Sequence, residues 1–346
     1  MPIIKVNVAI IGNMTISNQL VTPADYLSFT LSNNKSFHIV SASRSPIRLK
    51  RFFEMTRLIF KWNVKLDIVF LQFYSGVPSY LLQTFIVLYA KVFKCKLVFY
   101  LHGGDIPNFT IKYSRWTNML FGQASCIMAP SNYLLDFSKS LGFECVLVPN
   151  MIDIQKYHFK HRETKEPLIL WMRSFHDVYN PKLMIDALLI LISKYPQIKL
   201  IMAGKDKGVE NEVKNYVNSL GLDKYVDFPG FLDETSKLNY ISKCNIFVST
   251  SRKDNMPICI VEAFASGLPV VSSNVGGVPD LVNSGISGIL FDDNDVKGLV
   301  DGIEKVITDA DFRHSVVNYG LMIAKRSSLQ AVSTQIESLL MTVHNH

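Results

Sequence analysis

Residues 251–282 read SRKDNMPICIVEAFASGLPVVSSNVGGVPDLV, and the prediction of the fold starts from this stretch. A polar loop ends at Pro257, and a helical run follows over residues 258–265, which Gly267 brings to an end. An apolar strand is predicted for residues 269–273, with a turn at Gly276 and Gly277 behind it. Loop, helix, strand and glycine-rich loop in this order are typical of one half of a doubly wound sheet, whose ligands bind beyond the carboxyl ends of the strands.

Two acidic residues, Asp254 and Glu262, lie on either side of the start of this predicted helix. Carboxylates are poor phosphate ligands, but they accept hydrogen bonds from the paired hydroxyls of a sugar. Helix N-termini and glycine backbone, in contrast, offer N–H groups that suit phosphate. The combination predicts a nucleotide-sugar site, although Asp254 as a helix cap and Glu262 as a solvated side chain fit these two residues equally well.

The stretch resembles the donor-site signature of family 4 glycosyltransferases, which have the GT-B fold. The matching residues are Glu262-Ala263, Ser266-Gly267-Leu268-Pro269-Val270 and Gly276-Gly277-Val278-Pro279. Two positions depart from the family pattern, because Asp254 and Asp280 each stand where Glu is usual. The resemblance implies an α/β protein with two Rossmann-like doubly wound domains facing across a cleft. It also implies a retaining transfer of a hexose-type sugar from a UDP- or GDP-sugar to an acceptor hydroxyl, with no metal and no cofactor besides that substrate.

Composition and length fit a folded protein of two domains. The chain has 346 residues, of which 48% are hydrophobic and 19% charged, so it can build full cores and is not a disordered chain. Its five cysteines form no Cys-x-x-Cys pair and are predicted to be buried free thiols of a reducing compartment. The start of the chain lacks the features of a signal peptide, and the longest apolar segment, residues 77–90, is too short to cross a bilayer. These features predict a cytoplasmic protein that is either soluble or peripherally bound at the inner face of the membrane.

Charge is distributed unevenly along the chain. Residues 1–150 hold 15 Lys and Arg against 6 Asp and Glu, whereas residues 151–346 hold 21 against 23, so the first half is expected to contact something anionic. Residues 44–65, with Arg44 and Lys65 at the ends, show a basic amphipathic pattern that suits an anionic membrane surface. An ordinary Rossmann helix with a solvated basic face explains the same pattern. No nucleic-acid-binding module is present, so no nucleic-acid partner is expected.

Short apolar strands alternate with helical stretches throughout, which indicates parallel sheets. Twelve strands are predicted, at 5–11, 37–41, 66–73, 96–102, 124–129, 146–149, 168–173, 198–203, 226–228, 246–249, 270–273 and 288–291. We predict an acceptor-binding domain at residues 1–157, a donor-binding domain at 166–320 and a helical tail at 321–346. The resemblance implies that the tail packs back on the first domain.

The acceptor site is predicted in the first half. His102 follows a strand directly, and its Gly103-Gly104-Asp105 sequence would let a ligand approach closely. A single histidine is usually structural, but the segment resembles the His-Gly that family 4 enzymes place on the acceptor side of the donor sugar. Gly12 and Asn13 occupy the place of the family's glycine-rich acceptor loop. The expected acceptor is a lipid-linked or surface-polysaccharide glycan.

The phosphate site is predicted around Arg173, which ends a strand and whose guanidinium can bind a diphosphate in bidentate fashion. The family has a Lys a few residues further on, where this chain has Tyr179-Asn180, and Lys205 or Lys207 could supply the missing charge. The resemblance implies catalytic roles for His102, Asp254 and Arg173. The other donor-binding candidates are Gly230, Phe231, Asn255, Met256, Pro257, Glu262, Gly276 and Gly277.

Three other functions are alternatives to a glycosyltransferase. A catalytically inactive partner subunit that binds a nucleotide fits the missing Lys and the Asp254 substitution, and a nucleotide-sugar epimerase could share the fold. A Rossmann oxidoreductase requires Gly-x-Gly-x-x-Gly after the first strand, and residues 12–17 read GNMTIS instead.

Overall fold

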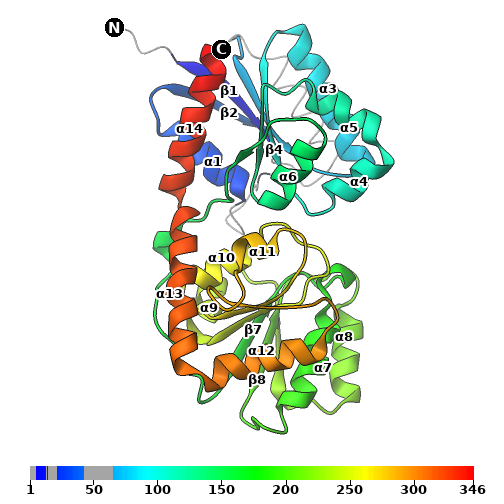
Figure 1. Ribbon diagram of the computed structural model, residues 1–346, viewed down its shortest axis with the longest axis vertical. Helices are drawn as coiled ribbons and strands as arrows, with labels where there is room; N and C mark the ends of the chain where they lie inside the picture. The colour runs from blue at the N-terminus through cyan, green and yellow to red at the C-terminus, as the bar shows by residue number, and fades with distance from the viewer. Residues whose placement is uncertain (1–4, 13, 15–21, 43–64) are drawn as a thin grey trace. The chain divides into compact units, whose positions relative to one another are not determined.

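The computed structural model describes residues 5–12, 14, 22–42 and 65–346, and its contacts divide the chain into two compact units (Figure 1). The first unit extends to Ile152 and includes Ser328–His346, and the second is Asp153–Ser327. The predicted boundaries at 157, 166 and 320 lie close to these junctions, and the last helix belongs with the first unit. The basic segment 44–65 lies outside the described residues except for Lys65, which is exposed.

A parallel six-stranded sheet in the order β2-β1-β3-β4-β5-β6 forms the first unit. Its strands are β1 (Val6–Ile11), β2 (Phe37–Ala42), β3 (Ile68–Phe73), β4 (Lys96–Leu101), β5 (Cys126–Ala129) and β6 (Val146–Leu147). Its helices are α1 (Pro23–Ser32), α3 (Val77–Val92), α4 (Ile106–Lys112), α5 (Ser114–Phe121), α6 (Asn132–Ser140) and α14 (Leu329–Asn345). All six residues of β3 are buried, as expected of a parallel strand covered on both faces.

Different helices cover the two faces of this sheet. One face packs with α3 and α5 around Phe73, Phe99 and Phe121. On the other face α14 inserts Val332, Ile336 and Leu340, whose spacing of four places them on one side of the helix. Figure 1 shows α14 beside α1 and away from α3 and α5 within this unit. The tail therefore closes the core of the first unit.

A second parallel six-stranded sheet, in the order β12-β11-β10-β7-β8-β9, forms the second unit. Its strands are β7 (Leu168–Met172), β8 (Lys199–Ala203), β9 (Val226–Gly230), β10 (Ile246–Ser249), β11 (Val270–Ser273) and β12 (Ile289–Phe291). Its helices are α7 (Pro181–Leu191), α8 (Glu210–Ser219), α9 (Glu234–Lys243), α10 (Ile258–Ala265), α11 (Val278–Leu281), α12 (Val296–Thr308) and α13 (Ala310–Arg326), with 3-10 turns at Ile154–Lys156, Asp177–Tyr179 and Asp223–Tyr225.

The strand order of the second sheet reverses between β7 and β10, which are hydrogen-bonded neighbours. In open α/β sheets such a switch point leaves a crevice beyond the carboxyl ends of the two strands, because the loops that follow them diverge to opposite faces. Trp171 anchors this region, since its ring is fully buried and its Nε1–H donates to Thr250 Oγ1 at 2.9 Å. The carboxyl ends of β7 and β10 are therefore held at a fixed separation.

The predicted strands are all present in the predicted order, with ends that differ by at most two residues. The prediction for the cysteines was partly wrong, because Cys95 and Cys126 are only half-buried, although all five are free. No helix in the described part of the chain is long and apolar enough to cross a membrane.

Candidate functional site

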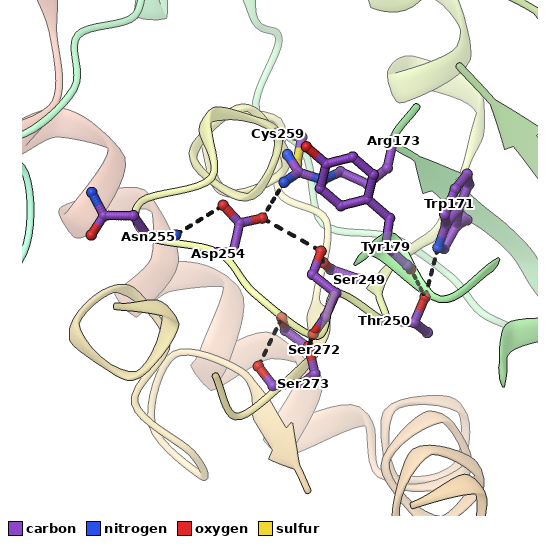
Figure 2. A network of polar contacts seen from close by, with 11 residues as sticks. Trp171, Arg173, Tyr179, Ser249, Thr250, Asp254, Asn255, Cys259, Ser272 and Ser273 are labelled. Atoms are coloured by element: carbon purple, nitrogen blue, oxygen red, sulfur yellow. Dashed lines mark hydrogen bonds and ion pairs between the residues drawn. The ribbon is translucent and has the colours of Figure 1, made fainter. Parts of the chain in front are cut away.

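Arg173 and Asp254 meet at the switch point of the second sheet. Arg173 directly follows β7 and Asp254 lies in the loop after β10, and Arg173 Nη2 forms an ion pair with Asp254 Oδ2 (Figure 2). The two side chains are only 16% and 13% exposed, so the pair is largely withdrawn from water. The sequence prediction placed both residues at one site, and the structure brings them into contact across 81 residues of chain.

The guanidinium of Arg173 is held by more than its ion pair. The Tyr179 ring lies 4.2 Å from the guanidinium carbon, and Nη1 donates to Cys259 Sγ at 3.5 Å. Burial alone would lower the pKa of Arg173, but the Asp254 carboxylate, with Cys259 and Tyr179, raises that pKa above its usual value. An aromatic ring thus stacks on the arginine where the resemblance places a lysine, so the position contributes a cation–π contact rather than a second charge.

The loop that carries Asp254 is fixed by close backbone packing. Asp254 Oδ1 accepts the Asn255 N–H at 2.9 Å, and Ser251 Oγ donates to Oδ2 at 3.4 Å. Gly276 has φ +53°, and a Cβ there would lie 2.0 Å from the Asp254 carbonyl oxygen. Only glycine fits this position, because it avoids the clash and tolerates the left-handed conformation. The glycine turn therefore sets where the Asp254 loop lies.

Glu262 is buried in α10 and has two partners that the sequence prediction missed. Lys237 Nζ of α9 and the Tyr157 hydroxyl, at 2.7 Å, both donate to Glu262 Oε1. Glu262 is 6% exposed and Lys237 9%, so a solvated Glu262 is excluded. Asp254 is likewise not a helix cap, because the N-cap of α10 is Pro257. Both contacts of Glu262 use one oxygen, which leaves Oε2 without a protein donor among the described residues.

Cys259 connects the two acids of the predicted site. It lies one turn before Glu262 on α10 and contacts the Arg173 guanidinium. Burial raises the pKa of the Cys259 thiol to about 11, and the nearby Arg173 offsets part of that increase. The thiol is therefore neutral, and Arg173, Asp254 and Glu262 all lie close enough to Cys259 to influence it electrostatically.

Lys205 and Lys207 lie in the loop after β8, next to the loop that follows β7. Phe175 pairs with this loop through two backbone hydrogen bonds. Its N–H donates to Lys205 O at 2.9 Å, and its carbonyl accepts from the Lys207 N–H at 3.0 Å. A Cβ on Gly204 would lie 1.7 Å from the Arg173 carbonyl oxygen, so glycine permits this approach. Both lysine side chains are exposed and neither forms an ion pair shorter than 4 Å among the described residues.

The remaining donor-site candidates lie at the same edge of the second sheet. Gly230 ends β9 with φ +75°, and the Phe231 ring behind it is 44% exposed. The three residues between Asp254 and α10 are all buried, namely Asn255, Met256 and Pro257. Gly277 N–H donates to the Asp254 carbonyl at 3.3 Å.

The acceptor-site candidates lie at the carboxyl edge of the first sheet. His102 follows β4, where its backbone N–H donates to Phe73 O at 2.8 Å, and Gly103 has φ +97°. Asp105 is exposed before α4 and accepts from Asn108 Nδ2 at 3.2 Å, while Gly104 is half-buried. Gly12 directly follows β1 and is buried, and Asn13 lies outside the described residues.

Gln72, which the sequence prediction missed, lies in β3 beside this group and is 3% exposed. Its Oε1 accepts the Tyr74 hydroxyl at 2.9 Å, and the Tyr74 ring stacks on His102 with 5.4 Å between centroids. Gln72 Nε2 and His102 Nε2 are both buried without a hydrogen-bond partner among the described residues. Burial lowers the pKa of His102 to about 3, so its imidazole is neutral at neutral pH. One amide donor and one imidazole nitrogen are therefore left for a ligand.

The part of the chain that the structure describes contains no group of three or more metal-ligating side chains. The donor-site candidates belong to the second unit and the acceptor-site candidates to the first. Each set is assembled within its own sheet edge.

These sites can be compared with known proteins. Residues 153–321 match the family model of glycosyl transferases group 1. That range corresponds to the second unit and contains the Arg173–Asp254 pair, Glu262 and the glycine turn. The lipopolysaccharide core biosynthesis mannosyltransferase LpsB of Rhizobium meliloti is 25% identical over 214 residues, which are 57% of this chain and 60% of LpsB. The chain spans 66%, 40% and 39% of the length of three of the curated relatives it matches.

Solved structures show the fold. HepE of Anabaena, in complex with UDP, superposes with a TM-score of 0.76 over 97% of this chain and 100% of HepE, at 17% identity. Sucrose-phosphate synthase of Thermosynechococcus elongatus gives 0.81 over 98% of this chain and 99% of that one, at 14% identity. The fold is GT-B, with two Rossmann-like units, as the sequence predicted.

Proposed function

We propose that the chain is a retaining glycosyltransferase of the family 4 type, which transfers a hexose-type sugar from a UDP- or GDP-sugar to an acceptor hydroxyl. The observation that carries the proposal is the buried Arg173–Asp254 pair at the β7/β10 switch point, within the unit that matches group 1 glycosyl transferases. The proposed acceptor is a lipid-linked or surface-polysaccharide glycan, which the lipopolysaccharide role in the name of LpsB supports.

The diphosphate would bind Arg173 together with the exposed amino groups of Lys205 and Lys207. Arg173 uses Nη1 and Nη2 for Cys259 and Asp254, whereas its Nε is buried without a partner among the described residues. A guanidinium has five N–H donors, so it can hold Asp254 and a phosphate oxygen at once. Because Asp254 already neutralises Arg173, we expect the two lysines to supply the net positive charge that a diphosphate needs.

The hydroxyl groups of the donor would bind the two acids. Glu262 Oε2 has no protein donor among the described residues and would accept from the ribose, while Lys237 and Tyr157 hold Oε1. Asp254 would accept from the transferred sugar. Its side chain is one methylene shorter than the usual Glu, but Arg173, Ser251 and the Asn255 N–H fix its position.

In the proposed reaction the bond between the anomeric carbon and the β-phosphate oxygen breaks while the acceptor oxygen attacks from the same face. The electron pair of the broken bond goes to the phosphate, whose charge Arg173 stabilises, and that phosphate takes the proton of the acceptor hydroxyl. His102, being neutral, would accept or donate a hydrogen bond to the sugar rather than act as a cation. This scheme requires no metal and no cofactor from the protein.

The test is a screen of UDP- and GDP-sugars for donor consumption and sugar transfer by the full chain, with EDTA present in a parallel series. We expect turnover of at least one donor, retention of anomeric configuration by NMR, and no effect of EDTA. An inverted product would contradict the retaining assignment. Nucleotide binding without turnover of any donor would instead support the inactive partner subunit.

A further inference from the structure

Helix α3 in the first unit exposes an apolar stripe along its whole length. Its sequence, VPSYLLQTFIVLYAKV, contains a single charged residue, Lys91. Four apolar side chains are exposed, at 40%, 60%, 58% and 74%, namely Val77, Leu81, Leu88 and Val92. Their spacing of four, seven and four residues places them on one side of the helix. A helix that is hydrophobic all round is normally buried, so this exposed side calls for a partner.

Further apolar side chains are exposed on neighbouring elements. Phe93 follows α3 and is 49% exposed, Met119 of α5 is 49% exposed and Ile111 of α4 is 82% exposed. Helix α5 packs directly on α3, because Trp116 Nε1 donates to Thr84 Oγ1 at 2.8 Å. Figure 1 shows α3, α4 and α5 together on one flank of the first unit. We call these seven residues the outer apolar surface, which consists of Val77, Leu81, Leu88, Val92, Phe93, Ile111 and Met119.

Positive charges border this surface. Lys91 and Lys94 lie on either side of Val92 and Phe93, and Lys112 and Arg115 follow Ile111, and all four are exposed. Helices α3, α4 and α5 contain no acidic residue. Large apolar groups bordered by cations match the boundary of an anionic bilayer, where acyl chains lie beneath negative headgroups.

We propose that the outer apolar surface docks on an anionic lipid membrane, with α3 lying in the plane of the interface. The helix has 16 residues and would lie on the membrane rather than cross it, since a span needs about 20. A second copy of the chain is the less suitable occupant. A two-fold interface would place the same four cations against themselves with no acidic side chain from these helices to compensate.

This inference does not depend on the proposed function. It places the contact at α3–α5 and not at residues 44–65, whose sequence fitted either a membrane contact or an ordinary Rossmann helix. A membrane-docked first unit would bring the protein to acceptors that are attached to lipid.

The experiment is co-sedimentation of the full chain with vesicles of phosphatidylcholine alone and of phosphatidylcholine with phosphatidylglycerol, at low and at physiological salt. The test variants are Leu81→Glu/Leu88→Glu and Lys91→Gln/Lys94→Gln. The matched control is Leu189→Glu/Ile190→Glu, because those residues of α7 are 41% and 45% exposed in the second unit. Circular dichroism and gel filtration of each variant establish its fold and its oligomeric state.

We expect the wild type to bind the anionic vesicles and the Leu81/Leu88 variant to lose binding. Removing two cations near a charged surface should weaken binding roughly tenfold or more. The control should bind as the wild type does. The proposal is overturned if the wild type does not bind anionic vesicles, or if the Leu81/Leu88 variant binds them unchanged. It is also overturned if the wild type is a dimer that this variant dissociates, because the occupant is then a second copy.

Discussion

The carboxyl edges of the two sheets carry polar groups in opposite states. At the second sheet the buried charges are paired internally, Arg173 with Asp254 and Lys237 with Glu262. At the first sheet the buried groups are neutral, and Gln72 Nε2 and His102 Nε2 have no partner among the described residues. A buried charge without a partner costs far more free energy than a buried amide or imidazole without one, which explains why each buried charge of the second sheet has an opposite charge beside it.

The largest effect is expected when one partner of a buried ion pair at the second sheet is removed. Lys237→Met leaves the Glu262 carboxylate buried with only the Tyr157 hydroxyl, and we expect the second unit to lose about 3–5 kcal/mol of stability. Urea denaturation measures this loss. The matched control is Lys182→Met, which breaks an exposed pair with Glu212 and should cost less than about 1 kcal/mol. Equal effects of the two substitutions would show that Lys237 and Glu262 are not a buried pair.

Removing the charge of Asp254 separates its two proposed roles. Asp254→Asn should reduce sugar transfer about 10- to 100-fold, which is the value of a hydrogen bond to a charged group. UDP or GDP affinity should stay the same or increase, because Arg173 gains freedom to bind phosphate. Steady-state kinetics and calorimetry measure the two quantities. A loss of nucleotide affinity with unchanged turnover would assign Asp254 to nucleotide binding instead.

The neutral buried groups of the first sheet should make the stability of the folded chain sensitive to acid. The pKa of His102 falls from 6.5 to about 3 in the folded chain, so the unfolded chain binds its proton first as pH decreases. The contribution of His102 to the free energy of unfolding has its full value above about pH 6.5 and decreases as pH falls toward 3. Between pH 7 and pH 5 the expected decrease is about 2 kcal/mol.

His102→Gln should remove this difference between denaturation at pH 7 and at pH 5. The control is His158→Gln, because His158 is exposed. If the His102 variant loses as much stability on acidification as the wild type does, the imidazole is not buried in its neutral form.

Gln72 gives the smallest expected effect on stability. Gln72→Met removes a buried amide whose Nε2 lacks a protein partner, so the free energy of unfolding should change by less than about 1 kcal/mol. If the amide serves the acceptor, the KM for acceptor should rise while hydrolysis of the sugar donor continues at its former rate. A large loss of stability with unchanged acceptor KM would make Gln72 a structural residue.

The fold could be predicted from the sequence because its signals are local. Each strand is a short apolar run, and the parallel order follows from the alternation with helices. The place of α14 could be predicted only from the resemblance, since α14 joins the first unit through contacts with side chains from distant parts of the chain.

The candidate site was predictable only in part. Residues on the glycine-containing stretch and at the strand end, such as Asp254 and Arg173, were found from their positions. Tyr157 and Lys237 were missed because they reach Glu262 across 105 and 25 residues, and no local pattern marks such contacts. The sequence did carry a signal for Gln72, because Gln72 and Asp67 are the two polar residues in the otherwise apolar run 66–73. From the sequence, Tyr179 was interpreted only as the position where the family's lysine is missing. In the structure its ring stacks on the Arg173 guanidinium.

The account depends most directly on whether the guanidinium at the β7/β10 switch point binds a nucleoside diphosphate. Isothermal titration calorimetry of UDP and GDP against the wild type, Arg173→Gln and the exposed control Arg115→Gln measures this. We predict that the wild type and the control bind one of the two nucleotides equally well, and that Arg173→Gln binds it at least tenfold more weakly with an unchanged circular dichroism spectrum. Equal affinity of Arg173→Gln and wild type, or no binding of either nucleotide to the wild type, would contradict it.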